Sequence, residues 1–138
     1  MDDGARELLL RWVQKAEADW LAIGSLLAGQ RIPWDVVCFH CQQTAEKYLK
    51  ALLITLDVEF EPMHDLLRLA RLASGVEPEL RILFDPLSIL NPYSVQVRYP
   101  DDWREIEQDE GTAAVEQART IRLALRNLIS ARLDQPLP

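Results

Sequence analysis

The stretch that decides the fold is FHCQQTAEKYLKALL, residues 39–53, because it has the pattern of the middle of one long helix. Its apolar residues recur at three- and four-residue steps, which places them on one face of a helix with 3.6 residues per turn. The pattern extends back to Pro33, which suits a first helical turn, and forward to about Asp57. We therefore predict a long helix over residues 33–57 with a wide apolar face.

The same period predicts helices on both sides of this stretch. A long first helix covers residues 5–29, where a glycine is a natural stop, and a short helix covers residues 66–75. Another helix begins near Pro78 and carries leucines 80, 83 and 87. Pro86 lies inside it and predicts a kink or an early end, because proline lacks the N–H that a helix interior uses.

The remaining part of the chain is predicted to be one loop and one helix. Residues 91–103 hold two prolines and three aromatic residues without a helical period, so we interpret them as an ordered loop. Long ordered loops in compact domains are often functional. The last helix is expected to start at Ile106 or Gly111 and to run to Leu133, and residues 134–138 are expected to be frayed.

The whole chain is predicted to be a single all-α domain over residues 1–138, folded as an antiparallel up-and-down bundle of four to five helices. No segment shows the strict alternation of a half-buried strand. A hydrophobic content of 49% and a charged content of 27% are typical of globular proteins. Since the net charge is −7, any contact with nucleic acid would need a local basic patch.

The sequence predicts a cytoplasmic protein that does not enter a membrane. Residues 1–4, MDDG, lack the basic start and the apolar stretch of a signal peptide. No run approaches the roughly 18 to 20 apolar residues that cross a bilayer. Cys38 and Cys41 lie three apart in a predicted helix, which suits reduced packing thiols better than a disulfide or a zinc site. We expect no metal site and no cofactor.

Residues 39–52 resemble the F-H-x-x-Q-x-A-E-K-x-L-K-A-L helix of HEPN proteins. Two further pieces agree in order and spacing, namely HDL at residues 64–66 and YSVQVRYP at residues 93–100, and residues 16–20 also fit. The resemblance spans nearly the whole chain. It implies a small helical domain, commonly a homodimer, often encoded beside a minimal nucleotidyltransferase in a toxin–antitoxin-like pair. Members are associated with nucleotide binding or, in many branches, with metal-independent RNA cleavage.

The chain departs from the motif that is associated with RNA cleavage in this family. Cleaving branches resemble one another in an arginine and a histidine that are separated by four to six residues near the last helix. Arg98 stands in the matching loop, but the positions at that distance are Trp103, Arg104 and Glu105. The acid/base histidine is therefore missing from its expected place.

Several polar residues of the predicted second helix are candidate ligand contacts. His40, Gln43 and Lys47 lie at i, i+3 and i+7, so they share one side of the helix and could meet a phosphate or a base. The other interpretation is a polar strip in which Lys47 pairs with an acid across the bundle. Glu46 and Lys50, four apart, are expected to be a surface ion pair.

Two later segments carry the other candidates. His64 could act on a ligand, or it could simply contact the loop before a helix that Asp65 caps. Tyr93, Arg98 and Tyr99 could stack on bases and bind a phosphate, or they could wedge the loop onto the bundle. If a partner transfers nucleotides onto this chain, the two tyrosines of this exposed loop are the first acceptors to test.

Two functions therefore stay open from the sequence. The first is a module that binds a nucleotide or a partner nucleotidyltransferase without chemistry of its own. The second is an RNase rebuilt from Arg98 with His40 or His64 across the bundle or a dimer interface. The chain also holds more tryptophans than such a bundle is expected to bury, so one or two of them should mark a dimer or partner surface. The four are Trp12, Trp20, Trp34 and Trp103.

Overall fold

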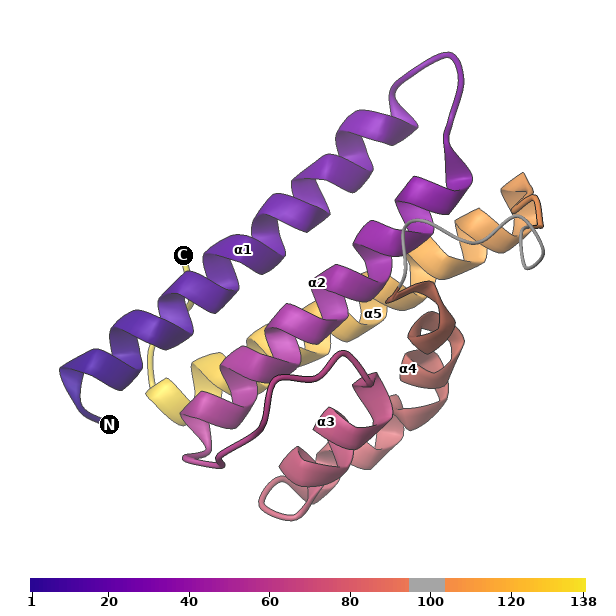
Figure 1. Ribbon diagram of the computed structural model, residues 1–138. Coiled ribbons are helices and arrows are strands. Elements are labelled where there is room, and N and C mark those ends of the chain that lie inside the picture. The colour runs from indigo at the N-terminus through magenta and orange to yellow at the C-terminus, as the bar shows by residue number, and fades with distance from the viewer. Residues whose placement is uncertain (95–103) are drawn as a thin grey trace.

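A computed structural model describes residues 1–94 and 104–138 of the protein (Figure 1). Every regular element in these residues is a helix. The elements are α1 (Asp3–Leu27), α2 (Trp34–Thr55), α3 (Leu66–Ser74), the 3₁₀ helix η1 (Pro78–Leu83), α4 (Phe84–Leu90), the 3₁₀ helix η2 (Asn91–Ser94) and α5 (Gln108–Leu133). The predicted all-α bundle is confirmed. The predicted boundaries of the long helices hold to within a few residues.

The helix α2 lies at the centre, because α1, α3 and α5 all pack against it. Figure 1 shows that α1 runs antiparallel to α2, and that α3 and α4 carry the chain back along the bundle. As a result α5 runs parallel to α2 and antiparallel to α1. The short helices cover one side of α2 and α5, while α1 covers another side of α2.

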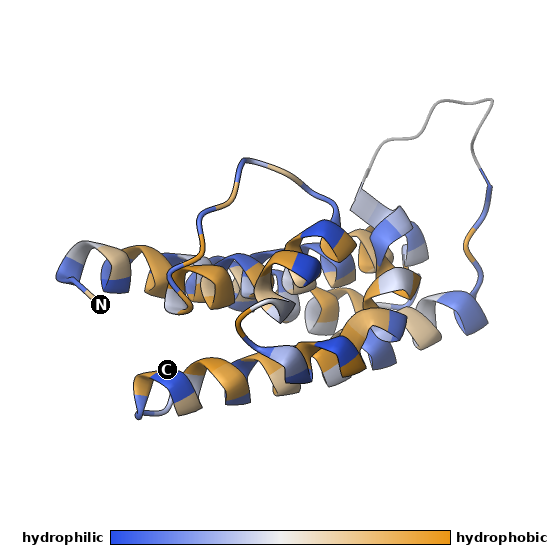
Figure 2. Ribbon diagram, turned by 90° about the horizontal axis from the view of Figure 1, so that it is seen from below, coloured by the Kyte–Doolittle hydropathy of each residue, from blue (hydrophilic) through white to orange (hydrophobic). Residues whose placement is uncertain are grey.

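The wide apolar face predicted for α2 explains its central place. Cys38, Cys41, Leu49 and Leu52 on this helix are completely buried, and so is Tyr48. Burying a large apolar side chain contributes about 1.5–3 kcal/mol, so a helix that is buried on most sides stabilises the bundle more than a surface helix does. Figure 2 shows hydrophobic and hydrophilic residues interleaved along every long helix, as expected where each helix has a buried and a solvated side.

The start of α5 depends on a glycine. A Cβ atom at Gly111 would lie 2.2 Å from Cε3 of Trp34, far inside van der Waals contact. The indole of Trp34 therefore packs directly against the backbone of α5. This contact fixes the N-terminal ends of the two parallel helices side by side.

The segment from Pro78, which was predicted to be one kinked helix, forms two separate helices, η1 and α4. The chain forms η1 first, and Pro86 then falls in the first turn of α4. The N–H groups of a first turn have no partner within their helix, so proline costs nothing there.

Two other predictions about irregular segments are wrong. Residues 91–94 form η2 rather than loop, and residues 134–138 are not frayed. The backbone N–H of Leu137 donates to Oγ of Ser130 at 3.3 Å, and Nη2 of Arg126 donates to the carbonyl of Pro138 at 2.9 Å. Leu137 is also buried. The tail is ordered because an arginine and a serine of α5 hold its backbone.

Candidate functional site

Two of the three residues in the predicted row on α2 meet the same carboxylate. Nδ1 of His40 lies 2.8 Å from Oδ1 of Asp19 on α1, and Nζ of Lys47 lies 2.5 Å from Oδ2. Gln43 instead donates from its side-chain amide to Oε1 of Gln42 at 2.8 Å. The structure thus gathers His40 and Lys47 around Asp19 and leaves Gln43 in a neighbouring network.

Asp19, His40 and Lys47 form what we call the closed triad. The side chain of His40 is 24% exposed, and that of Lys47 is 21% exposed. The interpretation in which Lys47 pairs with an acid across the bundle is therefore confirmed. Because the carboxylate comes from α1 and both of its partners come from α2, the closed triad ties these two helices together.

A second cluster with the same residue types surrounds Glu46, and we call it the open triad. Nζ of Lys50 lies 3.0 Å from Oε2 of Glu46, and Nδ1 of His64 lies 3.0 Å from Oε1. The side chains of Glu46 and Lys50 are only 3% and 7% exposed, whereas that of His64 is 75% exposed. The prediction of a surface ion pair is wrong. The ring of Trp12 on α1, with its centroid 5.1 Å from Nζ of Lys50, lies over this part of α2.

Hydrogen bonds fix the backbone at His64 and at the next residue, Asp65. Before α3, the completely buried side chain of Gln42 donates to the backbone carbonyl of His64 at 3.0 Å. At the start of α3, Asp65 accepts from two backbone N–H groups of the first turn at 3.0 and 3.3 Å. Asn91 also donates to Asp65, at 3.1 Å. The predicted capping role of Asp65 is confirmed, and the imidazole of His64 is set beside Glu46.

The two histidines share one orientation but not one environment. Because a carboxylate accepts hydrogen bonds, each ring donates one from Nδ1 to its acid. Nε2 of each ring is then left for a second contact. Nε2 makes no hydrogen bond with another described residue in either case. In His40 the ring is mostly covered, whereas in His64 it stands largely in solvent. Only His64 therefore presents an oriented imidazole that a ligand can reach from solution.

A third network, which the sequence did not predict, joins α1, α2 and α5. The hydroxyl of Tyr48 donates to Oε2 of Glu17 at 2.5 Å and accepts from Nη1 of Arg126 at 2.8 Å. Arg122 binds the same carboxylate with two N–H groups, at 2.7 and 2.6 Å. The only signal for it in the sequence is a pair of arginines four apart on the last helix. That spacing does not reveal which acid they meet.

The protonation of this network follows from its contacts. Burial alone would raise the pKa of Glu17, but the hydrogen bonds from Arg122 and Tyr48 and the charges of Arg122 and Arg126 outweigh it, so the pKa is lowered. Burial, followed by the hydrogen bond to Glu17, raises the pKa of Tyr48 to about 12. Near neutral pH the network therefore holds an ionised carboxylate and a neutral phenol.

The loop candidates are only partly placed by the structure. Tyr93 is buried, and its hydroxyl donates to Glu110, which also accepts two hydrogen bonds from Arg104, at 2.6 and 2.7 Å. Burial and this hydrogen bond raise the pKa of Tyr93. The prediction of an exposed acceptor is therefore wrong for Tyr93, because a neighbouring acid covers its hydroxyl. Arg98 and Tyr99, with Trp103, lie outside the described residues.

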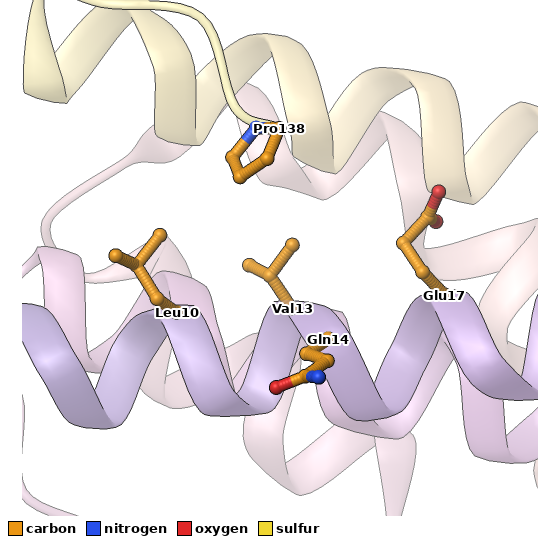
Figure 3. A pocket seen from close by; sticks show the side chains of 5 residues that line it. All are labelled: Leu10, Val13, Gln14, Glu17 and Pro138. Carbon is orange, nitrogen blue, oxygen red and sulfur yellow. The ribbon is translucent and has the colours of Figure 1, made fainter.

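A groove opens beside the third network, between α1 and the end of the chain (Figure 3). It encloses a pocket of about 520 Å³. Its lining residues are Leu10, Val13, Gln14, Glu17 and Pro138. Figure 3 shows Leu10 and Val13 pointing from α1 toward the ring of Pro138. We call it the α1–α5 groove, because the tail that closes it is bound to α5.

The two cysteines are packing residues, as predicted. Both are completely buried and free. Burial, with the nearby charges of Glu110 and Asp35, raises the pKa of Cys38 to about 12, and burial raises the pKa of Cys41 as well. Both are therefore neutral thiols. In the part of the chain that the structure describes, no three histidine, cysteine or acidic side chains are grouped so that they could hold a metal ion.

Comparison with known proteins gives one match. The family model described as HEPN domain matches residues 9–128 of the chain. No curated protein and no solved structure matches. Within residues 1–94 and 104–138, none of the helices combines the length and the apolar character that spanning a bilayer requires.

Proposed function

The chain belongs to the HEPN domain family, and on this premise we propose that it is a binding module for a protein partner rather than an enzyme. The partner that the resemblance of residues 39–52 suggests is a minimal nucleotidyltransferase, in a toxin–antitoxin-like pair. The central observation in support is that the charged residues and the histidine of the motif at residues 39–52 bind other residues of the bundle. His40 and Lys47 hold Asp19, and Glu46 holds Lys50 and His64, so the motif builds the bundle and leaves recognition to other surfaces.

The α1–α5 groove is the surface that we assign to the partner. Leu21 lies one turn beyond Glu17 on α1 and is 71% exposed, and Leu123 lies beside Arg122 on α5 and is 60% exposed. Together with the apolar residues that line the pocket, these leucines add to the apolar surface that α1 and α5 offer to a partner. Along its own helix, each lies within one turn of a residue of the Glu17–Arg122 ion pair, and neither lines the pocket.

The protein's own tail supports a particular kind of occupant. Leu137 buries its side chain, while its carbonyl and that of Pro138 accept hydrogen bonds from Arg126. A partner segment with an apolar side chain and free backbone carbonyls would make the same contacts. We therefore assign the groove to an extended apolar segment of the nucleotidyltransferase, which takes the place of the tail.

The first test of the companion role is the neighbouring reading frame, which must encode a minimal nucleotidyltransferase. That protein is then co-purified with this chain, and the affinity is measured. Leu21→Arg and Leu123→Glu are each expected to weaken binding about tenfold or more, because each puts a charge on apolar surface that the partner would cover. Ile82→Glu is the matched control, since Ile82 is 82% exposed and lies on η1.

Three results would contradict this proposal. One is the absence of such a neighbour, and another is an affinity that falls as much with Ile82→Glu as with the groove variants. The third is self-association that both groove variants abolish while the nucleotidyltransferase does not bind. That outcome would assign the groove to a second copy of this chain.

A second candidate function, a metal-independent RNase, is favoured by the open triad. The imidazole of His64 is oriented by a buried carboxylate and is 75% exposed, so a ribose 2′-hydroxyl can reach Nε2, as transfer of its proton to this ring requires. The test is incubation of the purified protein with tRNA and mRNA in the presence of a chelator, alone and as His64→Ala, His40→Ala and Arg98→Ala. If the wild-type protein cleaves RNA and His64→Ala does not, the chain is an RNase and the pure binding function is wrong. No cleavage by the wild-type protein would remove this candidate.

A further inference from the structure

Residues 136–138 have the composition of a preformed extended segment. They read PLP, so one leucine lies between two prolines. Proline fixes its own φ at about −65° and disfavours the helical conformation in the residue before it. Leu137 is therefore biased toward an extended backbone by Pro138 before any tertiary contact forms. A segment that is extended in advance loses less conformational entropy on binding than a flexible one.

The α1–α5 groove satisfies the backbone of this segment. Because the two prolines carry no N–H, Leu137 has the only backbone donor of the three residues, and it donates to Oγ of Ser130 at 3.3 Å. The carbonyls of Leu137 and Pro138 accept from Nη2 of Arg126, at 3.3 and 2.9 Å. The side chain of Leu137 belongs to the buried core. A serine and an arginine of α5 thus bind a proline–apolar–proline segment.

The arginine that binds the carbonyls is also held by contacts outside the segment. Nη1 of Arg126 donates to the hydroxyl of Tyr48 at 2.8 Å and lies 3.7 Å from Oε1 of Glu17. The side chain of Arg126 is only 19% exposed. Since these partners come from α2 and α1, they orient the planar guanidinium whether or not the segment is bound. The groove therefore offers a fixed donor for backbone carbonyls.

The segment fills only part of the groove. A pocket of about 520 Å³ remains between Pro138 and α1, and Leu10 and Val13 point toward the proline ring (Figure 3). Pro138 itself is exposed. A competing segment with a further apolar side chain would cover more of this surface and bind more tightly, because burial of apolar area is favourable. Residues 136–138 can therefore be displaced by such a segment.

From these contacts we infer that the α1–α5 groove is a receptor for extended proline–apolar–proline segments, and that residues 136–138 are its autoinhibitory ligand within the same chain. This inference deepens the docking function proposed above and rests on it for the identity of the partner. The partner must bring a segment of this class and must displace the chain's own. A short connection gives such a ligand an effective concentration of the order of millimolar, so a short free peptide competes poorly with it.

The test is calorimetric titration of the full chain with an N-acetylated, C-amidated peptide, DQPLP, which repeats residues 134–138. The wild type should bind it weakly, because its own segment occupies the groove. Leu137→Ser removes the buried side chain and releases that segment, so this variant should bind DQPLP about tenfold more tightly. Gln135→Ser is the matched control, since it introduces the same residue at an exposed neighbouring position and should bind as the wild type does.

Two altered peptides test the class of segment, with Leu137→Ser as the receptor. DQPSP should not bind at the same concentrations, because it lacks the apolar side chain. DQALA should bind more weakly than DQPLP, because its backbone is not extended in advance. Ser130→Ala and Arg126→Lys, each added to Leu137→Ser, should weaken the binding of DQPLP about two- to tenfold, as expected for a lost hydrogen bond. Thermal melts check that each variant folds.

The inference is overturned if DQPLP does not bind Leu137→Ser at millimolar concentration, or if DQPSP binds as well as DQPLP. It is also overturned if the wild type or Gln135→Ser binds DQPLP as tightly as Leu137→Ser does. The titration does not involve the nucleotidyltransferase, which Leu137→Ser should capture more tightly than the wild type. A chain that binds DQPLP as expected but captures no nucleotidyltransferase would contradict the docking function alone, and the reverse result would contradict only this inference.

Discussion

The closed and open triads contain the same chemical groups and differ in what surrounds them. In each, one carboxylate lies between Nδ1 of a histidine and Nζ of a lysine, at distances of 2.5 to 3.0 Å. In the closed triad the histidine is 24% exposed, and in the open triad it is 75% exposed. The burial of the acid and the lysine is reversed, because Glu46 and Lys50 are buried more deeply than Asp19 and Lys47.

This difference teaches that residue type and spacing do not fix a role. The closed triad joins two helices and keeps its histidine inside the contact. The open triad places a buried ion pair behind an exposed imidazole, so its ion pair contributes to the interior while its histidine faces solvent. Substitutions in the two triads should therefore have unequal effects.

The largest effect is expected for Glu46→Gln. This change leaves the ammonium of Lys50, which is 7% exposed, without a counter-ion. The free energy of unfolding should fall by about 3–5 kcal/mol, the usual cost of breaking a buried ion pair from one side. The measurement is urea unfolding followed by circular dichroism. The double variant Glu46→Leu with Lys50→Met should recover most of the loss, and a loss below about 1 kcal/mol in Glu46→Gln would show that solvent reaches the pair.

A smaller effect is expected for Asp19→Asn in the closed triad. It removes the carboxylate from His40 and Lys47, but both retain some contact with water, so neither is left fully buried without a partner. The expected loss is about 1–3 kcal/mol by the same measurement, in the range for hydrogen bonds to charged groups. A loss as large as that of Glu46→Gln would contradict the ranking of the two triads by burial of their ion pairs.

Glu17 is a third carboxylate to compare with those of the two triads, and its charged partners are arginines. We expect it to make the free energy of unfolding depend on pH. Its pKa is lower in the folded state than its ordinary value of 4.5, so the unfolded chain takes up the proton first as the pH falls. The stability that this group contributes is complete above that value and is lost as the pH falls through the folded pKa. Glu17→Gln should therefore flatten the loss of stability between about pH 5 and pH 3 relative to the wild type. The prediction is wrong if the free energy of unfolding of Glu17→Gln, measured by chemical denaturation, falls over this pH range as steeply as that of the wild type.

The smallest effect on stability is expected for His64→Ala. The ring is largely in solvent, so its removal should change the free energy of unfolding by less than about 0.5 kcal/mol. His40→Ala, its counterpart in the closed triad, should cost about 1 kcal/mol, because it leaves Asp19 with one partner fewer in a mostly buried contact. Thermal unfolding of the two variants side by side gives the comparison. Equal losses would mean that the His64 ring is held more tightly than its exposure indicates.

Features that depend on neighbours in the chain could be predicted from the sequence. The helices follow from the period of the apolar residues, and the cap at Asp65 forms within the next three residues. Pro86 predicted an interruption of the helix that starts near Pro78, but its position between η1 and α4 was not predicted, because it depends on where α4 begins. The order in the tail was missed, because it depends on contacts with Ser130 and Arg126.

The candidate site was harder to predict because ion pairs between helices depend on how the helices pack. The row of His40 and Lys47 was found from its spacing, but its acid, Asp19, belongs to another helix and was not identified. For Glu46 and Lys50 the spacing was right and the expected exposure was wrong. Trp12 and His64, which lie over or beside the pair, come from distant positions.

The sequence by itself therefore determined the all-α fold, the central helix and the membership in the HEPN family, because these depend on local periodicity and on an ordered set of motifs. The tertiary structure alone decided which acid each histidine meets, which ion pair is buried, and that Arg126 holds the backbone of the tail. Burial and pairing across elements are properties of the packed chain. They arise only when residues far apart in the sequence exclude water from one another.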